Sequence, residues 1–379
     1  MTTDLNQKSK PAYQMICDDV KCGILDGTYQ PAEQLPTIKN LAKRYKVSLV
    51  TAVRAINILK EQGYVSTTWG GGCFIAEKAA VKKADRIATL TVSGEPLFSY
   101  DPIVSYWDQI FSQTIFGVQY QCAREKIKNQ SILIPLATIT DVDTLSVYLG
   151  QQLMDVDGAI CVWHDINPQT AEYIQLAVAK PVIFSTFGVE GWHRFNCVQI
   201  DLYDLTCKMV QHLIDAGHER IACIAGVDLE DRCYRQRVEG YLDTLKKNNL
   251  PANKDLMFYT EDRQAAIFKC CSLCLDEYPK KGFTAVFCFN DYRALALMQT
   301  AEECGVVVPD QLAVAGFDGT PQAIKKGITT IQLPFYQVGC EATLLLEAIV
   351  DGRLQPPIQK RISPGIILGK STTLNFSNN

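Results

Sequence analysis

The sequence predicts an α/β protein with a winged helix-turn-helix domain at its N-terminus. Two observations support this prediction. The first 76 residues contain helical apolar patterns followed by a glycine-rich pair of short strands, and from Ile87 onward strands and helices alternate. Charge divides the chain in the same way, because residues 1–76 contain nine Lys/Arg and six Asp/Glu (net +3), whereas the remainder carries a net charge of −7. A basic head on an acidic body indicates an anion-binding module attached to something that is not one.

Length and composition set the class of protein. A chain of 379 residues with 47% hydrophobic content is expected to form roughly two to three globular domains. The first ten residues, MTTDLNQKSK, contain no apolar segment of a signal peptide, and no run of about 18 apolar residues follows, so we expect a cytoplasmic protein without membrane contact. The fifteen cysteines are expected to be reduced thiols packed as small hydrophobic groups.

The head is predicted to begin with three helices. In "AYQMICDDVKCGILDG", apolar residues recur at helical spacing, and Gly27 ends the pattern. Thr37 is an N-cap candidate for the helix in "LPTIKNLAKRY", and Ser48 is one for the helix that follows. That third helix is expected to bury the residues that repeat at i, i+3, i+4 and i+7, which are Ala52, Ala55, Ile56 and Leu59.

The end of the head is predicted to form the β-wing of a winged helix-turn-helix domain. The segment "YVSTTWGGGCFIA" predicts two short strands around a glycine-rich tip. Glycine runs can also hold phosphate, but a P-loop requires Gly-Lys-Ser/Thr before a helix, which is absent here. The charged segment 77–86, "EKAAVKKADR", lacks periodicity and is the predicted linker.

The body is predicted to be doubly wound. Its strand candidates, such as "GAICVW" and "PVIFSTF", are nearly continuous apolar runs, which is typical of parallel strands buried on both faces. Helical segments lie between them. The predicted strands are "IATLTV", "SILIPLA", "GAICVW", "PVIFSTF", "CVQID", "RIACIAG", "TAVFCFN" and "QLAVAGF", and the predicted helices include 105–123, 141–153, 204–216, 235–248, 291–304 and 337–350.

The third head helix is predicted to read DNA. Between Lys39 and Lys60 there are six Lys or Arg residues and no Asp or Glu, and phosphate contacts supply most of the affinity of such domains. Ser48 and Thr51 add hydroxyl groups, and a helix of this kind enters the major groove by its N-terminal end. The cations expected near phosphates are Lys43, Arg44, Lys46 and Arg54. The alternative is a solvated basic face on a protein-docking helical domain.

Residues 11–76 resemble the GntR family of DNA-binding domains. The carrying motifs are "LPTIKNLA", "VSLVTAVRA" and "GGGCFIA", in that order. The resemblance implies DNA contacts at Thr37, Lys39, Ser48, Leu49, Thr51, Val53, Arg54 and the wing residues Gly70, Gly71 and Gly72.

Two positions depart from the family pattern. The family commonly has Arg where this chain has Leu49 and Val53. An aliphatic side chain can contact a thymine methyl but cannot read guanine, so this pair predicts an A/T-rich half-site. The alternative is that both side chains pack inward.

No catalytic arrangement is found in residues 87–379. Neither a G-x-S-x-G nor an H-E-x-x-H motif occurs, and the four histidines share no metal-ligand spacing, so we expect no enzyme, metal or cofactor. Cys271 and Cys274 form a C-x-x-C without a second pair, inside what reads as an amphipathic helix, so a structural role is expected.

Polar residues follow several predicted strands, at the edge where doubly wound sheets bind ligands. A carboxylate, an amide and a guanidinium converging there can bind vicinal hydroxyls, and aromatic rings can stack on a sugar. Each aromatic alone is more often a core residue, and Asp318 can instead bond backbone N–H groups of its turn. The candidates are Trp107, Ser185, Thr186, Phe187, Arg237, Phe287, Phe289, Asn290, Asp291 and Asp318.

Residues 197–372 resemble the LacI/GalR effector-binding domain, which is related to periplasmic sugar-binding proteins. The matching stretches include "RQRVEGYLDTL", "TAVFCFNDYRALALMQTAEECGVVVPDQLAVAGFDGT" and "GIILGKST". The resemblance implies effector contacts at Arg237, Asn290, Asp291 and Asp318. Two departures are the segment "SGEPLFSYDPIVSYWDQ" after the first strand and Lys370 in place of Arg.

A GntR head on a LacI-type body is the arrangement of arabinose-type repressors. The resemblance implies two lobes in residues 87–379, the first about 87–196 with 332–353 and the second about 197–331 with 354–379. We expect a homodimeric regulator, a repressor of carbohydrate genes that binds palindromic, double-stranded operator DNA. A sugar or sugar phosphate is expected to control it by closing the lobes. The alternatives are a sugar-binding receptor with an accessory domain and an enzyme of unknown chemistry.

Overall fold

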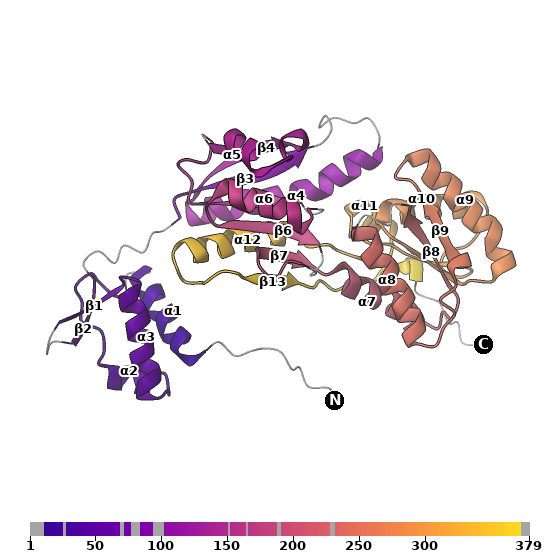
Figure 1. Ribbon diagram of the computed structural model, residues 1–379. Helices are drawn as coiled ribbons and strands as arrows, with labels where there is room; N and C mark the ends of the chain where they lie inside the picture. The colour runs from indigo at the N-terminus through magenta and orange to yellow at the C-terminus, as the bar shows by residue number, and fades with distance from the viewer. Residues whose placement is uncertain are drawn as a thin grey trace.

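Three bodies follow one another along the molecule. The computed structural model of the chain describes residues 11–25, 28–68, 72–76, 84–93, 102–150, 152–163, 166–187, 191–227 and 232–372. Figure 1 shows the small helical head at one end, a first α/β lobe in the middle and a second α/β lobe at the other end. The chain therefore has the predicted head-and-two-lobe architecture.

The head is a winged helix-turn-helix. Its helices are α1 (Ala12–Leu25), α2 (Ile38–Arg44) and α3 (Leu49–Glu61), and its wing strands β1 (Val65–Thr68) and β2 (Gly72–Ile75) pair antiparallel. The predicted caps are confirmed, since the hydroxyl oxygen of Thr37 accepts from the Asn40 amide at 3.3 Å and that of Ser48 accepts from the Thr51 amide at 3.1 Å. The predicted core of α3 is also confirmed, and its buried residues are Ala52, Ala55, Ile56 and Leu59.

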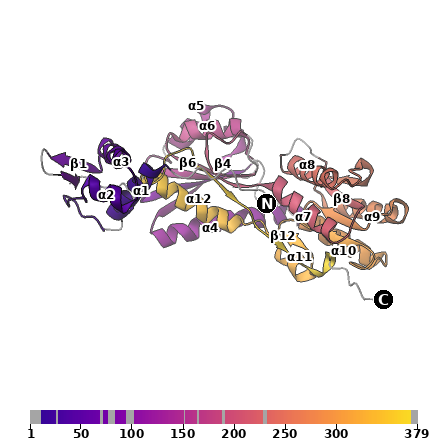
Figure 2. The same cartoon turned by 90° about the horizontal axis from the view of Figure 1, so that it is seen from below.

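The first lobe is built on a six-stranded parallel sheet. Its strands are β3 (Arg86–Ser93), β4 (Lys128–Pro135), β5 (Gly158–Val162), β6 (Val182–Phe187), β7 (Asn196–Ile200) and β13 (Gln359–Ile362), in the order β13-β7-β6-β5-β3-β4. Helices α4 (Pro102–Glu125) and α12 (Phe335–Val350) cover one face, and α5 (Val142–Gly150) and α6 (Pro168–Val178) cover the other (Figures 1 and 2). Because helices cover both faces, every described residue of β5 and β6 is buried.

The second lobe repeats this plan with four parallel strands. They are β8 (Ile221–Gly226), β9 (Met257–Thr260), β10 (Ala285–Cys288) and β11 (Ala313–Ala315), in the order β11-β10-β8-β9. The helices around them are α7 (Leu202–Asp215), α8 (Arg232–Lys247), α9 (Gln264–Lys281), α10 (Asp291–Glu303) and α11 (Pro321–Lys326). A short antiparallel pair, β12 (Thr330–Ile331) with β14 (Ile366–Ile367), lies outside this sheet.

The chain crosses between the lobes three times, after β7, between β12 and α12, and between β13 and β14. This corrects the expected boundaries in one respect. Strand β7 pairs with β6, and β13 pairs with β7, so residues 197–200 and 359–362 lie in the sheet of the first lobe rather than in the second lobe. The predicted linker ends earlier than expected, because Arg86 already pairs within β3, and its residues 77–83 lie outside the described part of the chain.

The cysteines are all free, and ten of the fifteen are buried. Burial raises the pKa of Cys271 to about 12 and that of Cys274 well above its ordinary value, as expected for packed thiols rather than reactive ones. Within the described ranges, no group of His, Cys, Asp and Glu is arranged to hold a metal ion. No helix among the described residues combines the length and apolar character needed to cross a membrane.

Candidate functional sites

The N-terminal end of α3 presents an apolar surface to solvent. Leu49, Val50 and Val53 are 56%, 78% and 40% exposed. The alternative in which Leu49 and Val53 pack inward is therefore wrong, because Ala52, Ala55 and Ile56 fill the core side of the helix. Beside them, the hydroxyls of Ser48 and Thr51 lie 2.8 Å apart. This face offers methyl groups and two hydroxyls, but no cation, to a partner.

Cations surround this apolar face. Lys39, Lys43 and Lys46 are exposed. Arg44 donates to the Tyr29 hydroxyl at 3.4 Å and lies 3.7 Å from Asp19. Neighbouring Tyr45, Tyr29 and Asp19 raise the pKa of Arg44 further above its ordinary value. The rim of the face is therefore positively charged.

Arg54 is held against an aromatic ring. Its guanidinium carbon lies 4.2 Å from the ring centroid of Tyr13 in α1. A guanidinium stacked in this way keeps its N–H edge free, which suits a phosphate contact.

The predicted wing contacts are only partly described. Gly70 and Gly71 lie outside the described residues, and Gly72 is the first residue of β2. Gly72 has φ +102°, and a Cβ atom there would lie 2.7 Å from the side-chain nitrogen of Gln34. The positive φ therefore favours glycine at this position, whereas the Gln34 side chain could move away from a Cβ atom.

The second lobe brings Arg237 and Asp318 together. Arg237 Nη2 lies 3.4 Å from Asp318 Oδ1, and the two side chains are 2% and 0% exposed. The guanidinium also lies 4.5 Å from the ring centroid of Phe317, while its Nε–H has no hydrogen-bond partner among the described groups. Asp318 has φ +110°, a conformation that costs energy in a residue other than glycine and is often found at ligand sites.

Asn290 and Asp291 follow β10 but play different parts. Asn290 caps α10, with its side-chain oxygen accepting from the Arg293 amide at 2.9 Å, and its buried Nδ2 has no partner among the described groups. The Asp291 carboxylate instead accepts from the Thr320 amide at 2.6 Å and the Thr330 hydroxyl at 2.7 Å. Asp291 therefore ties the 318–330 loop to α10, which differs from the effector contact expected for it.

The predicted sugar-stacking aromatics lie in the core. Phe287 and Phe289 are fully buried with ring centroids 5.4 Å apart, and Phe187 packs edge-on against Phe335 at 6.0 Å. Ser185 and Thr186 are likewise buried in β6. The side chain of Trp107, in α4, lies outside what the structure describes. The five described residues, Ser185, Thr186, Phe187, Phe287 and Phe289, are therefore buried in the lobes and do not form an exposed stacking surface.

Three further residues form a polar cluster at the end of β9. Arg293 is fully buried and donates to Asp262 at 2.7 Å, and the Tyr234 hydroxyl donates to the same carboxylate. Asp262 remains 34% exposed, so one side of it reaches solvent. The sequence-based prediction missed this cluster because β9 was not predicted. The signal in the sequence was the acidic pair Glu261 and Asp262 directly after "MFYT", a short segment with only a weak strand pattern.

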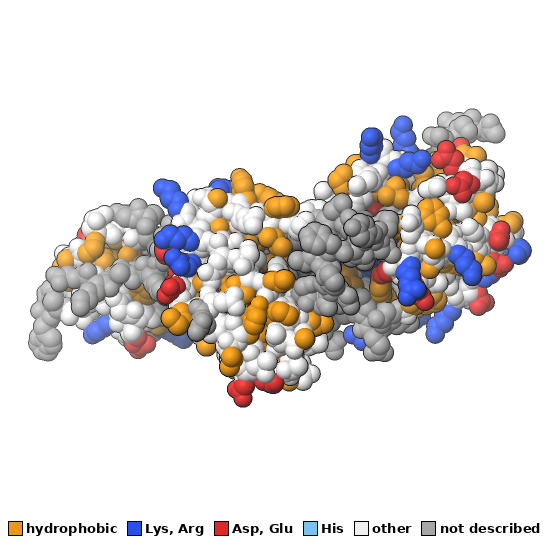
Figure 3. Space-filling model, turned by 90° about the horizontal axis from the view of Figure 1, so that it is seen from above, with side chains coloured by type: hydrophobic (Ala, Val, Ile, Leu, Met, Phe, Trp, Pro, Cys, Tyr) orange, Lys and Arg blue, Asp and Glu red, His pale blue; other side chains and the backbone are white. Residues whose placement is uncertain are grey.

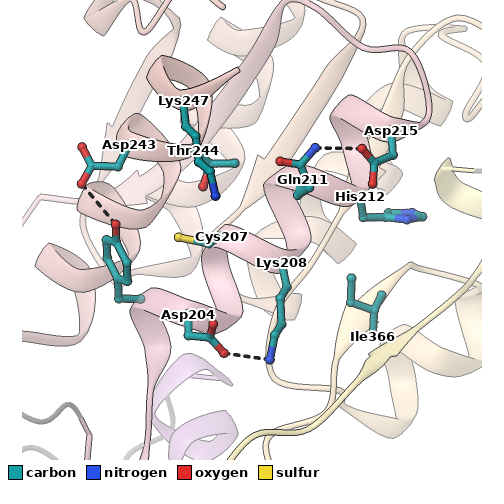
Figure 4. A pocket seen from close by; sticks show the side chains of 11 residues that line it. Asp204, Cys207, Lys208, Gln211, His212, Asp215, Asp243, Thr244, Lys247 and Ile366 are labelled. Carbon is teal, nitrogen blue, oxygen red and sulfur yellow. Dashed lines mark hydrogen bonds and ion pairs between the residues drawn. The ribbon is translucent and has the colours of Figure 1, made fainter. Parts of the chain in front are cut away.

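A groove of about 950 Å³ lies elsewhere, between α7 and α8 (Figure 4). Several of its polar groups bond to one another, since Lys208 pairs with Asp204 at 2.7 Å and the Gln211 amide donates to Asp215 at 2.8 Å. It contains none of the predicted effector contacts. Geometry and unpartnered donors therefore favour the ends of β10 and β11 as the ligand site.

Two family models match the chain in separate parts. Residues 12–75 match bacterial regulatory proteins of the gntR family, and residues 210–372 match the periplasmic binding protein-like domain. The first range coincides with the structural head, and the second covers most of the second lobe together with α12 and β13.

Curated relatives align with the chain over much of their length. The chain is 23% identical over 384 residues to the arabinose metabolism transcriptional repressor of Geobacillus stearothermophilus, covering 97% of this chain and 99% of that one. It is 26% identical over 325 residues to the HTH-type transcriptional repressor PurR of Aliivibrio salmonicida (strain LFI1238), covering 84% of this chain and 93% of that one. Both relatives are transcriptional repressors by name.

Solved structures show the same fold. A transcriptional regulator CelR–cellobiose complex matches with a TM-score of 0.60 at 22% identity, over 89% of this chain and all of that one. The lac repressor dimer bound to operator and the anti-inducer ONPF also matches with a TM-score of 0.60 at 22% identity, over 77% of this chain and 95% of that one.

Proposed function

Because the chain joins a GntR-family DNA-binding domain to a periplasmic binding protein-like domain, we propose that it is a repressor of carbohydrate genes controlled by a sugar or sugar phosphate. It acts in the cytoplasm on double-stranded operator DNA. The relatives are repressors, so a sugar receptor with an accessory domain is not favoured.

The observation that carries the DNA-reading part is the exposed end of α3. Its apolar residues Leu49 and Val53 are 56% and 40% exposed, and exposed cations lie around them. Methyl contacts in the major groove and cation–phosphate contacts at its edges account for this arrangement. The half-site is therefore proposed to be A/T-rich.

The effector part rests on buried polar groups at the lobe crossing. Among the described groups, Arg237 Nε and Asn290 Nδ2 are buried donors without partners, and the buried Asp318 pairs with Arg237. A molecule with several hydroxyl or phosphate oxygens would satisfy these groups, whereas an apolar ligand would leave them unpaired. A sugar or sugar phosphate is the class of ligand that fits.

A homodimer fits both the expected palindromic operator and the surface of the first lobe. Figure 3 shows hydrophobic side chains gathered on one face of the middle lobe. In and next to β4 and α5, the exposed apolar residues are Leu133, Leu136, Val147 and Met154. A cluster of this kind on an edge strand is typical of an interface. One related structure, the lac repressor, is described as a dimer on its operator.

The experiment is a selection of bound duplexes from a random pool by the full-length protein, followed by affinity measurements over a range of salt. We expect a palindromic, A/T-rich site and a steep fall in affinity with salt, whose log–log slope drops by about one when Lys43 is replaced by Ala. A thermal-shift screen of monosaccharides and their phosphates would identify the effector, because a ligand of the native state raises the melting temperature. Failure to enrich any duplex would contradict the DNA-reading function.

A further inference from the structure

The head touches the body at the end of α12. Lys21 of α1 donates from Nζ to the backbone carbonyl of Gly352, and the Tyr64 hydroxyl donates to the backbone carbonyl of Asp351 at 3.2 Å. Lys21 Nζ also lies 4.8 Å from the ring centroid of Tyr64. Figure 2 shows α1 next to this end of α12. The two partner carbonyls are the C-cap of α12 and the residue after it.

This contact is close and largely excludes solvent. Lys21 is only 3% exposed, and burial lowers its pKa from the ordinary value for lysine. The carbonyls at a helix C-terminus carry partial negative charge, which favours a cation there. A Cβ atom on Gly352 would lie 2.5 Å from the Tyr64 hydroxyl, so the two surfaces meet with no space for a side chain.

The body side is held in shape independently of the head. The Asp351 carboxylate is bonded to Arg353 Nε at 2.7 Å, and Arg353 also lies 3.5 Å from Glu347 of α12. Gly352 has φ +75°, which turns the chain after the helix. The α12 end is therefore a preformed surface that the head occupies.

Contact between the head and α12 leaves the exposed apolar face at the N-terminal end of α3, the proposed DNA-reading face, uncovered. The groove at this junction is lined on the head side by α1 and by Ile58 and Gln62 at the C-terminal end of α3. Leu49 and Val53, at the opposite end of α3, remain exposed. The docked position is therefore compatible with binding DNA.

The other end of α12 lies at the lobe crossing. The helix begins at Phe335, which packs on Phe187 of the first lobe. Two residues earlier, the Leu333 amide donates to the Asp318 carbonyl at 3.1 Å. Its 16 residues span about 24 Å at 1.5 Å per residue, so one helix connects the candidate effector site with the head.

We propose that the C-terminal turn of α12 is a docking surface that fixes the DNA-binding head on the first lobe, and that movement of α12 transmits effector binding to the head. The inference rests on the proposed function, since it assigns a role in DNA binding to Lys21 and Tyr64. In a dimer, two docked heads would read half-sites at one fixed separation. Undocked heads would accept several separations.

The test compares full-length wild type with Lys21→Met and Tyr64→Phe. In a selection from random duplexes, wild type is expected to enrich one half-site separation, and Lys21→Met several, with about tenfold weaker binding to the wild-type site because the heads are no longer preorganised. Lys60→Met, which removes one exposed head cation away from the junction, is the matched control and should keep the single separation. Tyr64→Phe removes one hydrogen bond and should give an intermediate result, which serves if Lys21→Met does not fold.

Amide hydrogen exchange on the same proteins provides a readout that does not depend on DNA. Exchange in α1 and in residues 350–355 should rise in Lys21→Met and stay unchanged in Lys60→Met. Unchanged exchange together with an unchanged half-site separation in Lys21→Met would overturn the docking proposal. If wild type enriches no duplex while exchange still responds to Lys21→Met, the docking contact stands and the DNA-reading function fails.

Discussion

At the scale of single residues, Asn290 and Asp291 show how neighbours can serve different purposes. Asn290 keeps an unpartnered donor beside the candidate effector site, whereas Asp291 accepts hydrogen bonds from Thr320 and Thr330. The motif places both after a strand, and the sequence alone predicts both as ligand contacts. The direction of each side chain depends on the 318–330 loop, which is distant in sequence.

Asp291 provides a test of this division. In Asp291→Asn, an amide group faces donors from Thr320 and Thr330, so we expect a loss of about 1–3 kcal/mol in unfolding free energy. Urea unfolding followed by circular dichroism measures it. A direct effector contact at this residue would instead show unchanged stability with weakened ligand binding.

The same substitution predicts a pH dependence. Burial raises the pKa of Asp291 to about 6, despite hydrogen bonds that oppose the shift. A carboxyl with a raised pKa in the folded state binds more protons folded than unfolded, so its contribution to stability falls as pH rises from about 4 to about 6. The stability difference between wild type and Asp291→Asn should therefore shrink across that window, and a constant difference would contradict the assignment.

Leu49 gives the residue-scale test of DNA reading. Arginine reads guanine through two hydrogen bonds, so Leu49→Arg should shift selection toward guanine at one position per half-site, by roughly 1–3 kcal/mol. Val50→Arg is the positional control, because it adds the same charge to the same apolar surface at a 78% exposed position about 100° around the helix, and it should not reproduce the guanine preference of Leu49→Arg. An unchanged profile of selected sites in Leu49→Arg would show that this face does not contact bases.

At the scale of elements, the sequence predicts which side of a helix faces the core, but it does not predict which sheet a strand joins. The spacing of Ala52, Ala55, Ile56 and Leu59 fixes which side of α3 faces the core, and the structure confirms it. Strand β7 was predicted as a strand but assigned to the wrong lobe, because an apolar run does not reveal its neighbours. The lobe crossing follows from pairing with β6, which only the folded chain shows.

The crossing of α4 and α12 is a test at this scale. These helices meet at Gly117, where a Cβ atom would lie 2.0 Å from the Tyr336 carbonyl oxygen. Gly117→Ala should therefore separate the helices and destabilise the first lobe by about 1–3 kcal/mol, as overpacking does. Gly150→Ala, at the end of α5 with open space around it, is the control and should be neutral or stabilising by up to about 1 kcal/mol. Equal melting temperatures for the two variants would contradict a tight crossing.

At the scale of the whole molecule, the candidate effector site and the DNA-reading face lie in different bodies. Asp318 belongs to the second lobe, yet its backbone bonds to Ile331 and Leu333 at the segment that crosses into the first lobe. A ligand that displaces Asp318 would therefore also displace the segment that crosses between the lobes. Closure of the two lobes around the ligand would be a hinge motion. A substitution at the effector site is then expected to weaken effector binding without weakening operator binding.

Asp318→Asn tests that separation. Asparagine keeps the shape of the side chain and tolerates positive φ, but it removes the charge that pairs with Arg237 and with the hydroxyls of a sugar. We expect affinity for the monosaccharide or sugar phosphate identified by thermal shift to fall tenfold or more, which corresponds to about 1.4 kcal/mol. Operator binding without that ligand should stay close to wild type, so the variant should act as a repressor that the sugar no longer releases. Measuring both affinities and the melting temperature on one preparation distinguishes this outcome from unfolding, in which all three would fall together.

Full sugar affinity in Asp318→Asn would place the effector contact elsewhere in the second lobe, with the Asp262 and Arg293 cluster at the end of β9 as the next position to test.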